Sequence, residues 1–187
     1  MVNYIDWIRF ICDLLTIEIP DIHLKQNDSF RNLFGENVQP FLLNKSAIAT
    51  TYPEQRVIKI DLDRVKNDMD LYIILTHEIR HIYQYIALYQ DDELNQELSS
   101  EEIKVWDKEL KTYKNSLDST YVEQEIEIDA IAFSYIVCRV IFNIAVKSDC
   151  NQTKLAKRIV ILANNYTQDE ILECARYIGI QPRKILA

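Results

Sequence analysis

Only two glycines and four prolines occur among the 187 residues of the chain. This scarcity limits the fold strongly, because tight turns and strand connections commonly use these residues. The stretches between them are rich in Leu, Lys and Glu, which favour helices, and in Ile and Tyr. The length suits one domain with a sizeable core. We therefore expect an α+β, mainly helical fold in a single domain over residues 1–187.

The clearest β signals are two short runs, at residues 46–52 and 56–61. Both are rich in β-branched residues with alternating polarity, and the segment Pro53-Glu54-Gln55 joins them. This pattern predicts a β-hairpin. A shorter strand is expected at residues 22–25, followed by a polar loop at residues 27–29. Either run of the hairpin could bind extended substrate backbone as an added strand, or the hairpin could only support the helix that follows it.

Apolar residues at helical spacing predict helices along the rest of the chain. Ser99 with Glu102, and Thr167 with Glu170, match the capping-box pattern that begins a helix. The segment between residues 90 and 120 is strongly charged, and it is either a plain connecting helix or a lid over the site. The expected helices cover residues 3–16, 70–90, 99–113, 121–137, 152–164 and 168–178.

The run His77-Glu78-Ile79-Arg80-His81 lies inside one of these helices, in a segment without Gly or Pro. Two imidazoles four residues apart lie on the same helix face, so one cation can reach both. In the metalloprotease pattern His-Glu-x-x-His, the glutamate takes a proton from a water that the metal acidifies. The alternative is that both imidazoles are ordinary hydrogen-bonded polar groups on a half-exposed helix.

A catalytic zinc site needs a third protein ligand. The metzincin pattern requires Gly and His at the positions where this chain has Gln84 and Ala87, so that class is excluded. The remaining histidine, His23, lies far upstream and is expected to be a surface or hydrogen-bonded residue. A carboxylate is therefore expected as the third ligand.

Acidic residues embedded in the apolar helix at residues 121–137 are candidates for this ligand, because a buried carboxylate needs a partner. Two registers are possible. Glu125 with Asp129 has the spacing of a ligand and an acid that orients a ligating histidine. Glu127 has the small residues Ala130 and Ser134 on its own face, which would allow the helix to approach a metal closely.

His77-Glu78-x-x-His81 followed by Glu127-x-x-Ala130-x-x-Phe133 resembles the ImmA/IrrE family of zinc metallopeptidases. The resemblance covers well under half of the chain and favours Glu127. It implies a zincin-like fold in which His77, His81 and Glu127 bind Zn²⁺ and Glu78 is the catalytic base.

The chain departs from the family pattern at Ile131, where Asn or Asp is usual. This departure leaves open which group orients a ligating histidine. The resemblance implies hydrolysis of peptide bonds in a specific protein or peptide substrate, such as a phage or mobile-element regulator. Two alternatives stay open: a catalytically silent zinc-binding scaffold, and a toxin or effector protease with another target.

The chain carries 21 basic and 29 acidic residues, for a net charge of −8. Nucleic acid is not an expected partner, because a nucleic-acid-binding protein needs a basic surface. The local run Lys154, Lys157 and Arg158 is expected to be a solvated helix face. No stretch has the length of a membrane span, the N-terminus lacks a secretory signal, and the four cysteines lack paired spacing. We expect a cytoplasmic protein with reduced cysteines.

Overall fold

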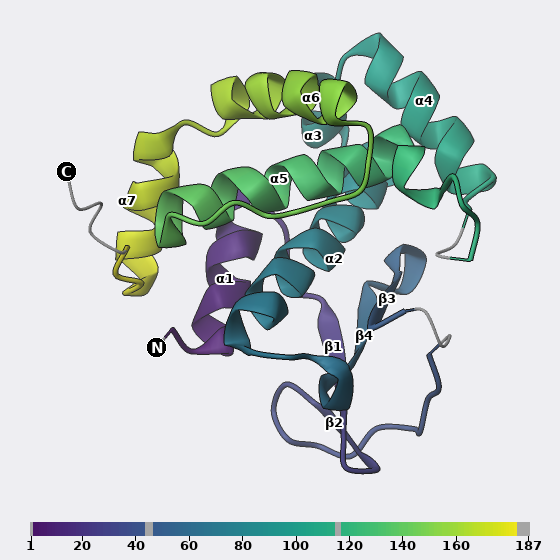
Figure 1. Ribbon diagram of the computed structural model, residues 1–187, viewed down its shortest axis with the longest axis vertical. Helices are drawn as coiled ribbons and strands as arrows, with labels where there is room; N and C mark the ends of the chain where they lie inside the picture. The colour runs from purple at the N-terminus through teal and green to yellow at the C-terminus, as the bar shows by residue number, and fades with distance from the viewer. Residues whose placement is uncertain (1, 44–46, 115–116, 183–187) are drawn as a thin grey trace.

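The structure is a computed structural model that describes residues 2–43, 47–114 and 117–182. Its helices surround one side of a small sheet, which confirms the mainly helical α+β class (Figure 1). Three short 3-10 helices, η1 (Pro53–Gln55), η2 (Leu62–Arg64) and η3 (Tyr121–Glu123), connect longer elements. Those longer elements are α1 (Tyr4–Leu14), β1 (Asp21–Gln26), β2 (Ser29–Asn32), β3 (Ala49–Tyr52), β4 (Val57–Asp61), α2 (Asp68–Tyr89), α3 (Asp92–Glu97), α4 (Ser100–Lys111), α5 (Glu125–Phe142), α6 (Gln152–Asn165) and α7 (Gln168–Ile178).

The sheet has the strand order β2-β1-β4-β3, with β1 and β4 parallel and the outer pairs antiparallel. The hairpin of β3 and β4 confirms the sequence prediction; Ser46, its expected first residue, lies outside the described residues. The prediction of a polar loop at residues 27–29 is wrong in part, because Ser29 already belongs to strand β2. Asn27 and Asp28 have positive φ angles of 48° and 59° and form a two-residue turn into β2, which Asn and Asp can do at low steric cost.

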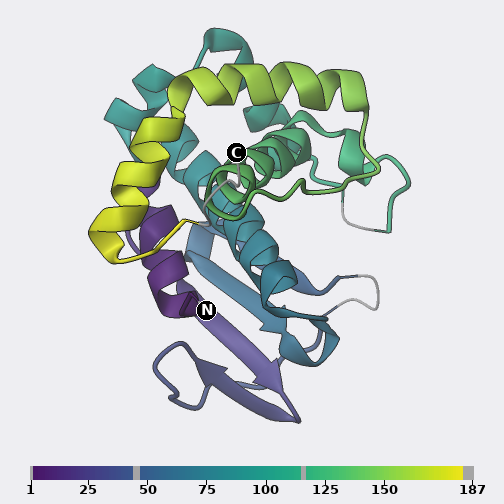
Figure 2. The same ribbon diagram turned by 60° about the vertical axis from the view of Figure 1, so that its left-hand side comes forward.

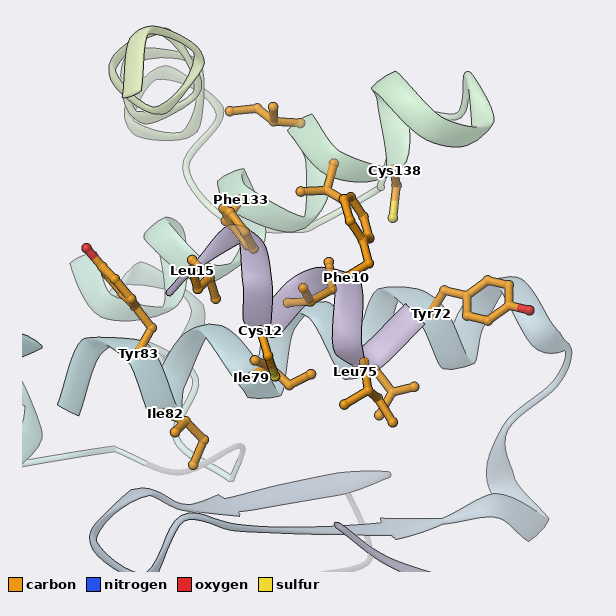
Figure 3. Packing of buried hydrophobic residues seen from close by; sticks show 14 of the residues in the cluster. Phe10, Cys12, Leu15, Tyr72, Leu75, Ile79, Ile82, Tyr83, Phe133 and Cys138 are labelled. Atoms are coloured by element: carbon orange, nitrogen blue, oxygen red, sulfur yellow. The ribbon is translucent and has the colours of Figure 1, made fainter. Parts of the chain in front are cut away.

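Helix α2 lies between the sheet and α5, and α6 packs on the outer side of α5 (Figures 1 and 2). The apolar sides of these elements form one buried cluster, to which α1 and α7 also contribute. Figure 3 shows Leu75 and Ile82 on the side of α2 that faces the strands, and Phe133 on α5. Helix α2 is therefore covered by β3 on one side and by α5 on another, and its central residues are buried between them.

The ends of the helices follow local signals in the sequence. Both predicted capping boxes are present, at Ser99 before α4 and at Thr167 before α7. Asn67 caps α2 by accepting a hydrogen bond from the Asp70 backbone N–H. Helix α3 was not predicted, because its six residues are too few to show a periodic pattern. Among the described residues, none of the helices combines the length and the apolar character needed to cross a bilayer.

Candidate metal centre

His77, His81 and Glu127 come together where α5 crosses α2. His77 Nε2 and His81 Nε2 lie 3.1 Å apart. Glu127 Oε2 is 3.3 Å from His77 Nε2, and Glu127 Oε1 is 3.3 Å from His81 Nε2. One ligand atom of each residue lies within 4.8 Å of the other two, so this group could hold a metal ion.

The surroundings of Glu127 fit a cation at this point. Its side chain is completely buried on α5, and among the described residues no group has the geometry of a full hydrogen bond to its Oε2, although His77 Nε2 approaches it at 3.3 Å. A buried carboxylate oxygen without a donor is costly. A metal ion between the two imidazoles and the carboxylate would satisfy this oxygen, and two histidines with one carboxylate form a common donor set for catalytic zinc.

The Glu127 carboxylate and the two imidazoles stabilise each other's charged forms. Burial alone would lower the pKa of His81, but the adjacent Glu127 carboxylate raises it to about 9. Burial would likewise raise the pKa of Glu127, but His81 and His77 hold it well below its usual value. A metal ion bound here would take the place of the proton in this pair, because a ligating imidazole must be deprotonated at the coordinating nitrogen.

Two hydroxyl groups from other elements reach the acidic residues of the site. Thr51 Oγ1, on the edge strand β3, lies 2.5 Å from Glu78 Oε2 and donates to it. The Tyr113 hydroxyl, just after α4, donates to Glu127 Oε1 at 2.5 Å. Burial and the nearby Glu127 carboxylate raise the pKa of Tyr113, so this hydroxyl remains a proton donor.

A groove with a volume of about 1010 Å³ runs beside the site, between β3 and helices α2 and α4. Glu78 and His81 form part of its wall. Much of the remaining lining is aromatic, and the tyrosines on it are Tyr52, Tyr85, Tyr89, Tyr113 and Tyr121. A ligand in the groove would therefore lie against both apolar rings and the acidic group that adjoins the metal centre.

Strand β3 presents a free edge to this groove. The Asp61 N–H donates to the Ile48 carbonyl at 3.0 Å, so these residues form a hydrogen-bonded pair between the strands. Hydrogen-bonded and non-hydrogen-bonded residue pairs alternate along an antiparallel ladder. Ala49 and Thr51 are therefore in non-hydrogen-bonded pairs, and their backbone N–H and C=O groups point away from β4. Because β3 is the last strand of the sheet in the described part of the chain, no described strand pairs with these groups, and another extended chain could do so.

Behind the histidines lies a buried polar network that sequence reasoning did not predict. Gln84 Oε1 lies 2.8 Å from His81 Nδ1, and Gln84 Nε2 donates to Asp129 Oδ2 at 2.7 Å. Asp129 also accepts hydrogen bonds from Arg80 at 2.8 Å and from Arg158 at 2.7 Å. Burial would raise the pKa of Asp129, but the two guanidinium groups lower it to about 2.

The network corrects one expectation and bears on one open alternative. Arg158 is not part of a solvated face: its side chain is only 12% exposed, because α6 packs on α5 and brings Arg158 to the buried Asp129. Lys154 does lie at the surface, where it donates to Glu125 at 2.6 Å. The Asp129 carboxylate is hydrogen-bonded to Arg80, Gln84 and Arg158. Among the described residues no hydrogen bond joins it to a histidine, so the direct contact that the register with Glu125 requires is not formed.

The other candidate residues lie away from the centre. Glu125, at the start of α5, has a partly exposed side chain and is absent from the group that could hold a metal. His23 Nε2 lies 2.7 Å from Asp21 Oδ2 on β1, as expected for a hydrogen-bonded histidine. Ile131, at the position where the resemblance calls for Asn or Asp, is almost fully buried in the apolar cluster.

Three residues of the site were not predicted, and only one of them could have been found from local sequence spacing. Gln84 follows His81 by three residues, so helical geometry alone places the two side chains on one face. Thr51 lies in the predicted hairpin, but nothing in the sequence pairs it with Glu78. Tyr113 is one of eleven tyrosines, and its position depends on how the chain runs between α4 and α5.

Comparisons of the chain with protein-family models, with curated proteins and with solved structures give no match. What the chain itself offers is a group of two histidines and a glutamate that could hold a metal ion. Glu78 lies next to this group and faces a groove with a free strand edge.

Proposed function

We propose that this protein is a zinc-dependent metallopeptidase of the zincin type, divergent from the ImmA/IrrE family that its motifs resemble. The observation that carries the proposal is the meeting of His77, His81 and Glu127 beside Glu78 at the wall of a groove. The substrate is a peptide bond in a specific protein partner, for which a phage or mobile-element regulator is our candidate.

The donor set and its neighbour favour zinc and hydrolysis. Two histidines and one carboxylate suit zinc with a free coordination position, and the same set also suits iron(II) in oxygenases. Glu78 favours the hydrolytic assignment, because its carboxylate adjoins the group and lines the groove. Oxygen activation has no need of a carboxylate base at this place, whereas hydrolysis needs a group that accepts a proton from water.

In this proposal His77, His81 and Glu127 hold the zinc ion. Zinc supplies Lewis acidity, which polarises a carbonyl oxygen and acidifies water. Glu78 is the catalytic residue that takes the proton from the water and later gives it to the leaving nitrogen. Thr51 holds the Glu78 carboxylate in place through its short hydrogen bond. The Tyr113 hydroxyl, protonated and close to Glu127, is our candidate for stabilising the oxyanion.

The groove favours an extended polypeptide as the substrate. Ala49 and Thr51 direct backbone hydrogen-bonding groups to the free edge of β3, where a peptide can be added as a further strand. The side chain of Thr51 contacts Glu78, so a peptide bound along β3 passes the proposed base. The tyrosines that line the groove suit large apolar or aromatic substrate side chains.

The test is a comparison of wild type with Glu78→Gln in host cells, with protein cleavage followed across the proteome. Glu78→Gln should keep its zinc, because Glu78 is not a ligand. It should lose cleavage by on the order of 10²–10⁴-fold, because an amide cannot accept the proton from water. Fragments that occur with wild type and not with the variant identify the substrate.

The alternative is a catalytically silent zinc-binding scaffold or interaction protein. Identical cleavage profiles for wild type and Glu78→Gln, with zinc bound in both, would favour this alternative. A generic peptide is a poorer probe, because a protease for one specific partner need not cut it.

A further inference from the structure

Gln84 connects His81 to the buried polar network. It lies one helical turn after His81 on α2 and is completely buried. Its Oε1 is 2.8 Å from His81 Nδ1, and its Nε2 donates to the Ile126 carbonyl at 2.9 Å and to Asp129 Oδ2 at 2.7 Å. We propose that Gln84 is a positioning residue that fixes the ring orientation and the tautomer of His81; this inference rests on the proposed metal site.

The hydrogen bonds of Gln84 allow only one orientation of its amide. Both N–H donors face acceptors, namely the Ile126 carbonyl and the Asp129 carboxylate. A rotation by 180° would place the amide oxygen against these two acceptors and leave it without a donor. The amide oxygen therefore faces His81.

This orientation decides which nitrogen of His81 is available to a metal. In the neutral ring, the hydrogen must lie on Nδ1, because Gln84 Oε1 can only accept. The lone pair is then on Nε2, the atom that faces His77 and Glu127. A ligating histidine commonly donates its second ring N–H to a carboxylate or carbonyl partner, and here the amide oxygen of Gln84 fills that place.

Asp129 anchors Gln84 from the other side. It is completely buried on α5, and Arg80 from α2 and Arg158 from α6 both donate to it. Arg158 also donates to Glu102 on α4 at 2.5 Å. His81 is thus connected through Gln84 to a cluster of charged side chains from α2, α4, α5 and α6. In this inference Gln84 takes the orienting role that a polar residue at the position of Ile131 would have.

The informative variant is Gln84→Leu, which removes the acceptor while keeping a similar volume. Loss of such a partner typically weakens metal binding by about 10–100-fold, and we expect a zinc affinity lowered by that factor in a competitive chelator titration. Gln84→Glu is not a suitable control, because its second carboxylate oxygen would face the Ile126 carbonyl and the Asp129 carboxylate, which are both acceptors. Asp129 is a poorer target, because its removal would leave two buried guanidinium groups without their partner.

Thr76→Val is the matched control for a general loss of stability. Thr76 is also a completely buried polar residue of α2, but its hydroxyl bonds to Trp7 and to the Tyr72 carbonyl rather than to the site. We expect it to lower the melting temperature and leave zinc affinity unchanged. A wild-type affinity in Gln84→Leu, or an equal loss in Gln84→Leu and Thr76→Val, would overturn the inference.

A measurement on the unmutated protein decides the matter if Gln84→Leu does not fold. In nitrogen-15 NMR spectra of the zinc-loaded protein, His81 should carry a hydrogen on Nδ1 that exchanges slowly with solvent and lies close to the Gln84 amide. Rapid exchange of this hydrogen, or zinc on Nδ1, would contradict the positioning role. Failure of the proposed function is distinguishable, because wild type itself would then bind no zinc.

Discussion

Glu127 and Glu125 lie two residues apart on α5, yet their carboxylates have opposite surroundings. Glu127 is completely buried against the two histidines, whereas the Glu125 side chain is 43% exposed and pairs with Lys154. Glu127→Gln should therefore lower zinc affinity by more than about 100-fold, beyond the loss of an outer partner. Glu125→Gln should leave it unchanged. A chelator titration of both variants measures this, and a reversed order would show that Glu125 is the ligand.

Tyr113 makes a second prediction at the scale of single residues. Tyr113→Phe removes the hydroxyl that donates to Glu127 and should leave zinc stoichiometry unchanged. If this hydroxyl stabilises the oxyanion, the cleavage rate should fall by about 10²–10³-fold, as for loss of one such donor. Tyr89→Phe is the control, because Tyr89 lines the same groove but donates to Asp107. Equal rates in both variants would exclude Tyr113 from this role.

The sequence predicts the three members of the metal-site group but not the groups that support them. The histidines are found from local spacing on one helix, and Glu127 from the resemblance. Gln84, Arg80 and Arg158 meet at Asp129 only because α2, α5 and α6 pack together. Such a meeting depends on tertiary packing, which the spacing of residues within one helix does not reveal.

At the scale of elements, the proposed pairing of the substrate with β3 can be tested separately from the metal centre. Ala49→Pro removes one outward N–H of this edge strand without breaking the ladder to β4, since proline is tolerated where the N–H points away from the sheet. Thr50→Pro, on the inward side, is the contrast and should destabilise the hairpin. We expect Ala49→Pro to keep its zinc and most of its stability and to lose at least about tenfold in cleavage rate, because a substrate hydrogen bond worth about 1–1.5 kcal/mol is lost. An unchanged rate would mean that the substrate does not pair with β3.

The elements themselves were largely predictable from local signals. The β3–β4 hairpin and the two capping boxes are where the sequence predicts them, and α2 matches its predicted helix closely. Helix α5 begins four residues later and ends five residues later than the predicted helix at residues 121–137. Strand β2 was missed because it is only four residues long and its turn uses Asn27 and Asp28 instead of glycine. The parallel pairing of β1 with β4 could not be predicted either, because it joins segments separated by more than thirty residues.

At the scale of the whole molecule, the candidate metal centre lies where the longest helix, α2, is crossed by α5. One buried cluster extends from Trp7 on α1 to Ile180 just after α7, so the ligands are held by a continuous core. The chain has a net charge of −8, and two of its basic side chains, Arg80 and Arg158, form ion pairs with the buried Asp129. Metal binding at this crossing would join two elements that are far apart in the sequence.

The most direct test of this account is the metal content of the purified protein, measured by mass spectrometry for wild type, His77→Ala and His23→Ala. The third histidine of the chain provides the control, because His23 pairs with Asp21 on β1 and is absent from the metal-site group. We predict about one zinc per chain in wild type and in His23→Ala, and near-complete loss in His77→Ala, because two remaining protein ligands do not make a tight site. Equal metal content in all three proteins, or no zinc in wild type, would contradict the assignment of the centre.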